Sequence, residues 1–126
     1  MDKKPKILII EDEKVLSEMY KTKFSKEGFT ALQAFDGVEG LSKAFSDKPD
    51  LILLDIIMPK KHGLDVLASL QKDDWGKSVP VIVLTNAPDY PGFANLTQGW
   101  HYEVMVKSDS TPEQVLNKVK DYLKGK

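Results

Sequence analysis

The sequence contains no cysteine, which excludes a disulfide framework and any metal site built on thiolates. Long apolar runs are also missing, because the longest have four or five residues and a membrane-spanning helix needs about 20. The apolar run at residues 7–10 is followed at once by three acidic residues, so we expect no export signal. These absences predict a cytoplasmic protein that is stabilised by an ordinary apolar core.

Neither sign of charge is in excess. The 18 basic residues are balanced by 19 acidic ones, which leaves a formal net charge of −1. A chain of this kind carries no basic excess of the sort that binds nucleic acid. We therefore expect neither a nucleic acid nor a membrane as partner. The 126 residues, of which 41% are hydrophobic, are enough for one domain with a core, and we expect residues 1–126 to form a single domain.

Short apolar segments alternate with longer amphipathic ones. The predicted strands are 6–10, 29–35, 51–55, 79–85 and 103–107. Helical spacing of apolar residues predicts helices at 13–26, 38–45, 62–73 and 111–123. The last of these has the clearest start, with Thr111 as N-cap and Pro112 at the first helical position. This alternation predicts an α/β fold in which a doubly wound, five-stranded parallel sheet carries helices on both faces.

The segment between the fourth and fifth predicted strands, residues 86–101, has a weaker helical pattern. It contains Pro88 and Pro91 together with two glycines, and a proline inside a helix breaks it. We therefore expect a fourth helix that is short or irregular, at about residues 91–98.

Polar side chains follow the predicted strands at the points where these end. Glu11 and Asp12 come after the first strand, while Asp55, Thr85 and Lys107 end the third, fourth and fifth. In open sheets of this type, ligands bind outside the carboxyl ends of the strands. Crowded carboxylates repel one another unless a cation intervenes, and these suit Mg²⁺. Lys107 and Thr85 could then contact phosphoryl oxygens, and Asp55 could form an aspartyl phosphate.

The chain resembles the response-regulator receiver domain, a CheY-like family whose members are phosphorylated on aspartate by histidine kinases. The resemblance covers essentially the whole chain. Its carriers are the segments "ILIIEDE", "LILLDIIMPKKHG" with Asp55, Pro59 and Gly63, "VIVLT" and "VMVKS". It implies a flavodoxin-like sheet with the strand order 2-1-3-4-5.

The resemblance also implies a role for each residue at the strand ends. Asp55 would be the phosphoacceptor, and Thr85 and Lys107 would bind the acyl phosphate. Mg²⁺ would be bound by three carboxylates and one main-chain carbonyl, those of Glu11, Asp12, Asp55 and Ile57. The phosphodonor would be a histidine kinase or a histidine phosphotransfer protein, and the phosphorylated domain would act on a downstream protein. Such a domain is a monomer or a phosphorylation-dependent dimer, and it is no enzyme with a turnover substrate.

Each of these positions also has a simpler interpretation when it is taken alone. Acids at residues 11–13 are favoured at a helix N-terminus, and Asp55 could cap a turn. Only the combination favours the phosphorylation site. We expect His62 at the exposed start of a helix rather than as a phosphodonor or metal ligand. The aromatic cluster at residues 100–102 could form a partner surface or seal the core beneath a short helix.

Three positions depart from the pattern of the family. The aromatic residue that is usual three positions before the lysine is replaced by Val104, although Tyr102 shares the same strand face and could substitute for it. Ser108 stands where a proline with a cis bond is common. Because a cis bond before another residue type costs about 2.5–4 kcal/mol, we predict a trans Lys107–Ser108 bond. Asn86 replaces a small residue, which would narrow access to the site.

Two alternative functions remain open. The chain could be a receiver-fold interaction module that is never phosphorylated, which the residues at positions 104 and 108 would allow. It could instead be a Mg²⁺ phosphohydrolase with an aspartyl nucleophile. Phosphatases of the haloacid dehalogenase type usually have a second aspartate two residues after the first, and this chain has Ile57 there.

Overall fold

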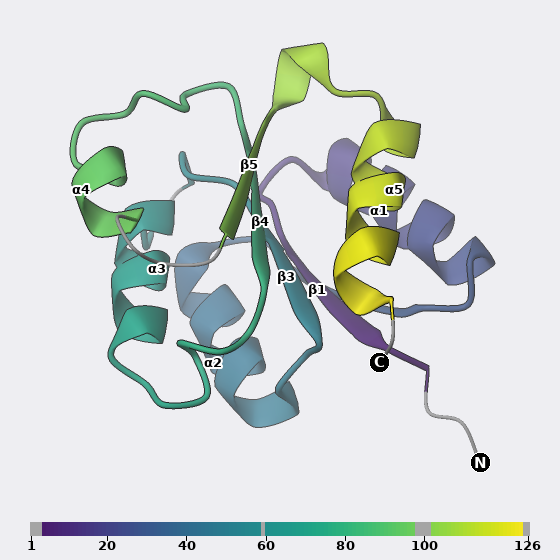
Figure 1. Ribbon diagram of the computed structural model, residues 1–126, viewed down its shortest axis with the longest axis horizontal. Coiled ribbons are helices and arrows are strands. Elements are labelled where there is room, and N and C mark those ends of the chain that lie inside the picture. The colour runs from purple at the N-terminus through teal and green to yellow at the C-terminus, as the bar shows by residue number, and fades with distance from the viewer. Residues whose placement is uncertain (1–3, 59, 98–101, 125–126) are drawn as a thin grey trace.

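The protein is described by a computed structural model that covers residues 4–58, 60–97 and 102–124. Five parallel strands form one sheet in the order β2-β1-β3-β4-β5, which confirms the predicted fold (Figure 1). The strands are β1 (Lys6–Ile10), β2 (Thr30–Ala34), β3 (Leu51–Leu54), β4 (Val81–Thr85) and β5 (Tyr102–Val106). The helices are α1 (Lys14–Lys26), α2 (Gly37–Asp47), α3 (Gly63–Gln71), α4 (Phe93–Thr97) and α5 (Pro112–Leu123), and a 3-10 turn, η1, spans Lys107–Asp109.

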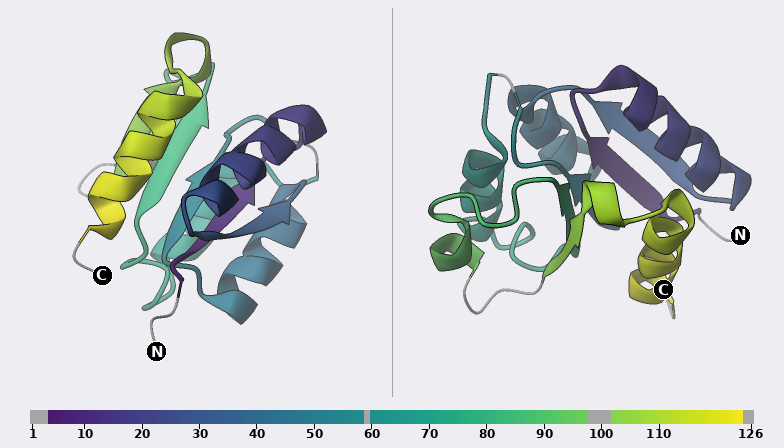
Figure 2. Two further views of the ribbon diagram at one scale, coloured as in Figure 1. Left: turned by 90° about the vertical axis from the view of Figure 1, so that its right-hand side faces the viewer. Right: turned by 90° about the horizontal axis from the view of Figure 1, so that it is seen from above.

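The helices form two layers that cover opposite faces of the sheet. Helices α1 and α5 lie on one side, and α2, α3 and α4 lie on the other (Figures 1 and 2). Alternate residues of the central strands point into two separate apolar clusters, as Leu8 and Ile10 do on the α2–α3 side and Ile7 and Ile9 on the α1–α5 side. Burial on both faces explains why the central strands are continuous apolar runs.

Strand β1 has the predicted bounds, and the ends of the other four strands differ from the predicted ones by one or two residues. Strand β4 begins at Val81 instead of residue 79, and the preceding Pro80 has no N–H to donate to a ladder. Strand β3 ends before Asp55 and β5 before Lys107. Both polar residues therefore directly follow a strand at the carboxyl edge of the sheet, where their side chains can face a common site.

The helix ends follow the local signals in the sequence. Thr111 caps α5 by accepting a hydrogen bond from the Gln114 N–H at 3.1 Å, and the Gln114 side chain accepts one from the Thr111 N–H at 2.8 Å. Gly28 follows α1 with a φ of +91°, a conformation that glycine adopts at little cost. Helix α2 starts one residue before the predicted helix because the Asp36 carboxylate accepts from the Glu39 N–H at 2.8 Å and caps it.

Helix α4 has five residues, which confirms the expected short helix, although residue 98 of the predicted range lies outside the described residues. Its position is set by contacts with its neighbours. The Gln71 side chain of α3 donates a hydrogen bond to the Leu96 carbonyl at 2.6 Å, and the Phe93 ring packs against Tyr102 of β5 at 5.8 Å. The short helix therefore adjoins α3 and covers part of the sheet at β5.

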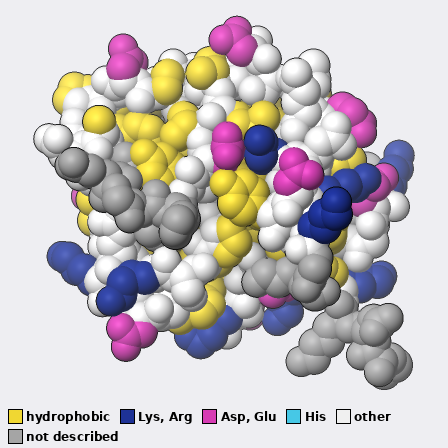
Figure 3. All heavy atoms as spheres, in the orientation of Figure 1, with side chains coloured by type: hydrophobic (Ala, Val, Ile, Leu, Met, Phe, Trp, Pro, Cys, Tyr) yellow, Lys and Arg dark blue, Asp and Glu magenta, His cyan; other side chains and the backbone are white. Residues whose placement is uncertain are grey.

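Polar and charged groups are spread over the surface. On the face shown in Figure 3, acidic and basic side chains of the described residues are interspersed, and apolar side chains gather at the upper left and in a strip that runs down the middle. In the described part of the chain, no helix has the length and apolar character needed to cross a membrane.

Candidate functional site

The polar residues predicted from the strand ends meet at one edge of the sheet. Ile10 of β1 pairs with Leu54 of β3, so Glu11 and Asp55 are the next residues on two adjacent strands. Their main chains remain attached to the sheet, because the Glu11 N–H donates to the Ala34 carbonyl at 3.0 Å and the Asp55 N–H to the Ile10 carbonyl at 3.1 Å. Their side chains therefore start from fixed positions.

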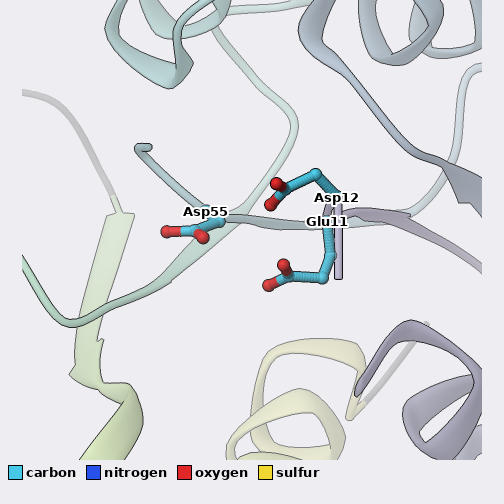
Figure 4. A group of neighbouring side chains, drawn as sticks. All are labelled: Glu11, Asp12 and Asp55. Carbon is cyan, nitrogen blue, oxygen red and sulfur yellow. The ribbon is translucent and has the colours of Figure 1, made fainter. Parts of the chain in front are cut away.

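Three carboxylates gather at this edge. Glu11, Asp12 and Asp55 each place one carboxylate oxygen within 4.8 Å of the other two. Figure 4 shows that the side chains of Glu11 and Asp12 leave adjacent positions of one loop and extend toward the side on which Asp55 lies. Glu11 and Asp55 are only 5% and 7% exposed, whereas Asp12 is exposed. The structure thus brings together the three carboxylates that the sequence assigned to a metal.

This set of oxygen donors fits a hard divalent cation. Mg²⁺ is commonly bound by one or two carboxylates and keeps several of its waters. Asp12 is exposed, so the group is open to solvent on one side, while the main chains of Glu11 and Asp55 are hydrogen-bonded to the sheet. Glu11, Asp12 and Asp55 could therefore hold Mg²⁺ with water in its remaining positions.

Lys107 lies between the two buried carboxylates. Its Nζ atom is 2.8 Å from Glu11 Oε1 and 2.8 Å from Asp55 Oδ2, and its side chain is 16% exposed. The other oxygens also have partners, because Glu11 Oε2 accepts from the Glu13 N–H at 2.9 Å and Asp55 Oδ1 from the Ile56 N–H at 2.7 Å. Both carboxylates are therefore satisfied without a metal.

The charges of the cluster are not fully balanced. Burial raises the pKa of Glu11, and the contact with Lys107 offsets this only in part. Burial alone would lower the pKa of Lys107, but its hydrogen bonds to Asp55 and Glu11 and their charges outweigh that effect, so its pKa is raised. Lys107 is therefore an ammonium at neutral pH. One ammonium facing three carboxylates leaves excess negative charge, which attracts a further cation.

The two remaining predicted residues, Thr85 and Ile57, lie at the carboxyl ends of β4 and β3. Thr85 is fully buried at the end of β4, and its hydroxyl oxygen accepts a hydrogen bond from the Ala87 N–H at 3.0 Å. A hydroxyl group can also donate one hydrogen bond. Ile57 lies in the turn after β3, two residues beyond Asp55, and its side chain is 48% exposed.

A glycine makes close packing behind Asp55 possible. Gly63 begins α3, and its N–H donates to the Ile56 carbonyl at 2.8 Å. A Cβ atom built at this position would lie 2.4 Å from the Asp55 carbonyl oxygen and 2.6 Å from the Ile56 Cα. Only a residue without a side chain fits there, so the packing of α3 against the Asp55 loop depends on Gly63.

The expectation that His62 is exposed is wrong. The residue is partly buried, its Nδ1 atom accepts a hydrogen bond from the Leu64 N–H at 3.2 Å, and its ring packs against Tyr90 at 4.7 Å. Its Nε2 atom is buried and has no hydrogen-bond partner among the described residues. The sequence places His62 correctly at the start of α3 but does not reveal that the loop after β4 would cover it.

We expect replacement of His62 by alanine to lower the free energy of unfolding by about 1 kcal/mol, the usual loss for a missing N-cap acceptor. Replacement by asparagine should recover most of this loss, because its side-chain oxygen can accept from the Leu64 N–H. Urea denaturation of the three proteins measures both effects. If the asparagine variant were as unstable as the alanine variant, the contact with Tyr90, and not the cap, would be the important one.

The structure shows the surroundings of the residues on and after β5 that depart from the family pattern. The Lys107–Ser108 bond is trans, as predicted. Tyr102 and Val104 are partly buried against the α2–α3 cluster, so Tyr102 helps to seal the core. Residues 100 and 101 lie outside the described residues. The sequence did not show that the Asn86 side chain accepts a hydrogen bond from the Ser108 N–H at 2.8 Å.

Comparison with known proteins places this geometry in a family. The family model of the response regulator receiver domain matches residues 7–120. The chain is 37% identical over 81 residues to the DNA-binding dual master transcriptional regulator RpaA of Synechocystis sp.. It is 41% identical over 80 residues to the transcriptional regulatory protein CpxR of Klebsiella pneumoniae. Each match covers 64% of this chain and 34% or 33% of the relative, so the chain spans about a third of the length of these relatives.

Solved structures have the same fold. The receiver domain of the Francisella response regulator 1452 is similar with a TM-score of 0.83 and 27% identity, over 97% of this chain and 99% of that one. The receiver domain of the sensor histidine kinase PA1611 from Pseudomonas aeruginosa matches with a TM-score of 0.83 and 20% identity, over 96% and 98% of the two chains. That receiver structure has a magnesium ion coordinated in its active-site cleft.

Proposed function

Since this chain belongs to the family of response regulator receiver domains of two-component systems, we propose that it accepts a phosphoryl group on Asp55. The donor is the phosphohistidine of a histidine kinase or of a histidine phosphotransfer protein. Phosphorylation then switches a surface that binds a downstream protein. Members of this family act as phosphorylated signalling domains, and the chain has the acids, the hydroxyl and the lysine for this chemistry.

The observation that carries this proposal is the environment of Asp55. Its carboxylate contacts the Lys107 ammonium at 2.8 Å and lies within 4.8 Å of the carboxylates of Glu11 and Asp12. A structural aspartate would need only one of these partners. A buried carboxylate with both a cation and further acids beside it is arranged to meet an incoming group that carries a metal and negative oxygens.

In the reaction, one carboxylate oxygen of Asp55 attacks the phosphorus atom, and the bond from phosphorus to the histidine nitrogen breaks. The departing imidazole keeps the electron pair and takes up a proton. Mg²⁺, held by Glu11, Asp12, Asp55 and the main-chain carbonyl of Ile57, would offset the negative charge on the phosphoryl oxygens. Lys107 binds one of these oxygens, and the Thr85 hydroxyl donates a hydrogen bond to another.

Phosphorylation of Asp55 would switch the binding surface because Lys107 and Thr85 exchange their hydrogen-bond partners. Before phosphorylation, Lys107 binds Asp55 Oδ2, and Thr85 accepts a hydrogen bond from Ala87 in its own loop. The phosphoryl group offers new negative oxygens to both side chains. Lys107 begins η1, in the connection from β5 to α5, and Thr85 is the last residue of β4, directly before the loop that leads to α4. Movement of these loops changes the surface that α4, β5 and α5 present.

A receiver-fold module that only binds partners is less well supported. Such a protein does not need three neighbouring carboxylates of which a lysine contacts two, because the cluster keeps an unbalanced negative charge. The haloacid dehalogenase type of phosphohydrolase is disfavoured because Ile57 has no carboxylate to act as general acid or base two residues after Asp55.

Titration with beryllofluoride, followed by NMR, tests the proposal. In the presence of Mg²⁺ we expect shifts of the amide signals of Asp55, Ile56, Thr85 and Lys107, because beryllofluoride adds to a carboxylate as a phosphoryl group does. Mg²⁺ alone and beryllofluoride without Mg²⁺ are the controls. If beryllofluoride with Mg²⁺ produced no change beyond that of Mg²⁺ alone, Asp55 would not be a phosphoacceptor and the interaction module would be the better interpretation.

A further inference from the structure

The main chain around Lys107 is held on both sides. On one side, the ladder between β4 and β5 ends with the pair Thr85 and Val106. On the other side, the Ser108 N–H donates a hydrogen bond to the side-chain oxygen of Asn86 at 2.8 Å. Asn86 therefore continues the connection between the two chains one step beyond the last pair of the ladder, and Lys107 lies between the two attachments.

A turn directs Asn86 toward this contact. The Thr85 hydroxyl oxygen accepts from the Ala87 N–H at 3.0 Å, a local hydrogen bond that is typical of turns begun by serine or threonine. Asn86 is the residue enclosed by this turn. Asn86 is exposed, so burial does not explain the orientation of its side chain, whose oxygen accepts the hydrogen bond from the Ser108 N–H.

We infer that Asn86 is a positioning residue for Lys107: by holding the Ser108 N–H, it fixes the loop from which the Lys107 ammonium reaches Asp55 and Glu11. The consequence for phosphorylation rests on the proposed function, whereas the consequence for the loop does not. Lys107 has a long side chain with considerable rotamer freedom. Fixing the main chain on both sides reduces the number of positions that its ammonium can reach.

The contact has a specific chemical requirement at each end. Position 86 needs a side-chain oxygen that accepts, and position 108 needs a main-chain N–H, which proline lacks. The Ser108 side chain takes no part in this hydrogen bond. Replacement of Ser108 by alanine should therefore be harmless, and replacement by proline should remove the hydrogen bond to Asn86 and also restrict the main chain of Lys107.

The experiment compares Asn86→Ala, Ser108→Pro and the double variant with the wild-type protein, with Ser108→Ala and Asn117→Ala as controls. Asn117 is an exposed asparagine on α5. The rate of Mg²⁺-dependent phosphorylation by acetyl phosphate should fall about fivefold in each single variant, in line with the loss of one exposed hydrogen bond. The double variant should be no slower than the slower single variant, because both changes remove the same contact.

Three further measurements separate positioning from a general structural role. The Mg²⁺ dissociation constant should change by less than about twofold, because none of the three carboxylates is altered. In the metal-free protein, hydrogen exchange at the Ser108 amide should become faster in Asn86→Ala, and the NMR signal of the Lys107 ammonium should broaden or disappear. Ser108→Ala should retain both signals of the wild type.

The possible failures can be distinguished. A wild-type protein that is not phosphorylated contradicts the proposed function, and the inference is then decided by the exchange rate of Ser108 and the ammonium signal of Lys107. If both remain unchanged in Asn86→Ala, the inference is wrong. It is also wrong if the wild type is phosphorylated and Asn86→Ala reacts at the same rate, or if the effects of Asn86→Ala and Ser108→Pro add in the double variant.

Discussion

The Asp55→Asn variant is expected to take up no phosphoryl group from acetyl phosphate and Mg²⁺, whereas the wild-type protein takes up one. The amide nitrogen and oxygen of asparagine occupy nearly the same space as the carboxylate but supply no anionic nucleophile. The hydrogen bond from the Ile56 N–H can still form, so the fold should be retained. Mass spectrometry of the intact protein after treatment with the phosphodonor measures the uptake.

Asp121→Asn is a suitable control for this experiment, because it removes one exposed carboxylate from α5, away from the strand ends. It should be phosphorylated at the rate of the wild type. A phosphorylated Asp55→Asn protein would place the phosphoacceptor on another residue, and fragmentation of the modified protein would identify it. Retained circular dichroism of Asp55→Asn is required to separate lost chemistry from lost structure.

The Lys107→Ala variant should be less stable than the wild type in the absence of Mg²⁺. Loss of the Lys107 side chain leaves Glu11 and Asp55 without the ammonium that lies 2.8 Å from each. These two residues are only 5% and 7% exposed. Removal of one partner from a buried ion pair commonly costs about 3–5 kcal/mol. Because the site is close to solvent and Asp12 is exposed, we expect a loss near the lower limit, about 3 kcal/mol, measurable by urea denaturation in EDTA.

Mg²⁺ should stabilise Lys107→Ala more than it stabilises the wild type. The ammonium and the metal offset the charge of the same carboxylates, so removal of the ammonium leaves more negative charge for the metal to bind. A ligand that binds the folded state more tightly raises the unfolding free energy further at the same concentration. Equal stabilisation of the two proteins by Mg²⁺ would contradict a metal site beside Lys107.

The rate of phosphorylation of Lys107→Ala should nevertheless be roughly 100-fold lower than that of the wild type at saturating Mg²⁺, because the variant lacks the positioned charge that meets the transferring group. Tighter metal binding together with slower chemistry distinguishes this result from simple unfolding. Lys118→Ala provides the control, since Lys118 makes a long, partly exposed contact with Glu103 at 3.8 Å. A solvent-accessible pair of this kind contributes little to stability, so that variant should resemble the wild type.

Most of the secondary structure could be predicted because its causes are local. The apolar runs of the central strands, the Thr111 cap with Pro112, and the prolines that shorten α4 act within a few residues of the chain. The set of polar residues at the strand ends was also predictable. Parallel strands bring their carboxyl ends to one edge of the sheet whatever their order, and the 2-1-3-4-5 order itself came from the family resemblance.

The contacts between loops were not predictable in this way. The sequence by itself determined the elements, the edge at which Glu11, Asp55 and Lys107 would meet, and the short fourth helix. Only the tertiary structure decided that Lys107 binds both acids, that Tyr90 covers His62, and that Asn86 holds Ser108. Each of these contacts joins side chains or main-chain groups of different loops, and their distances depend on strand register and helix packing, which no local pattern specifies.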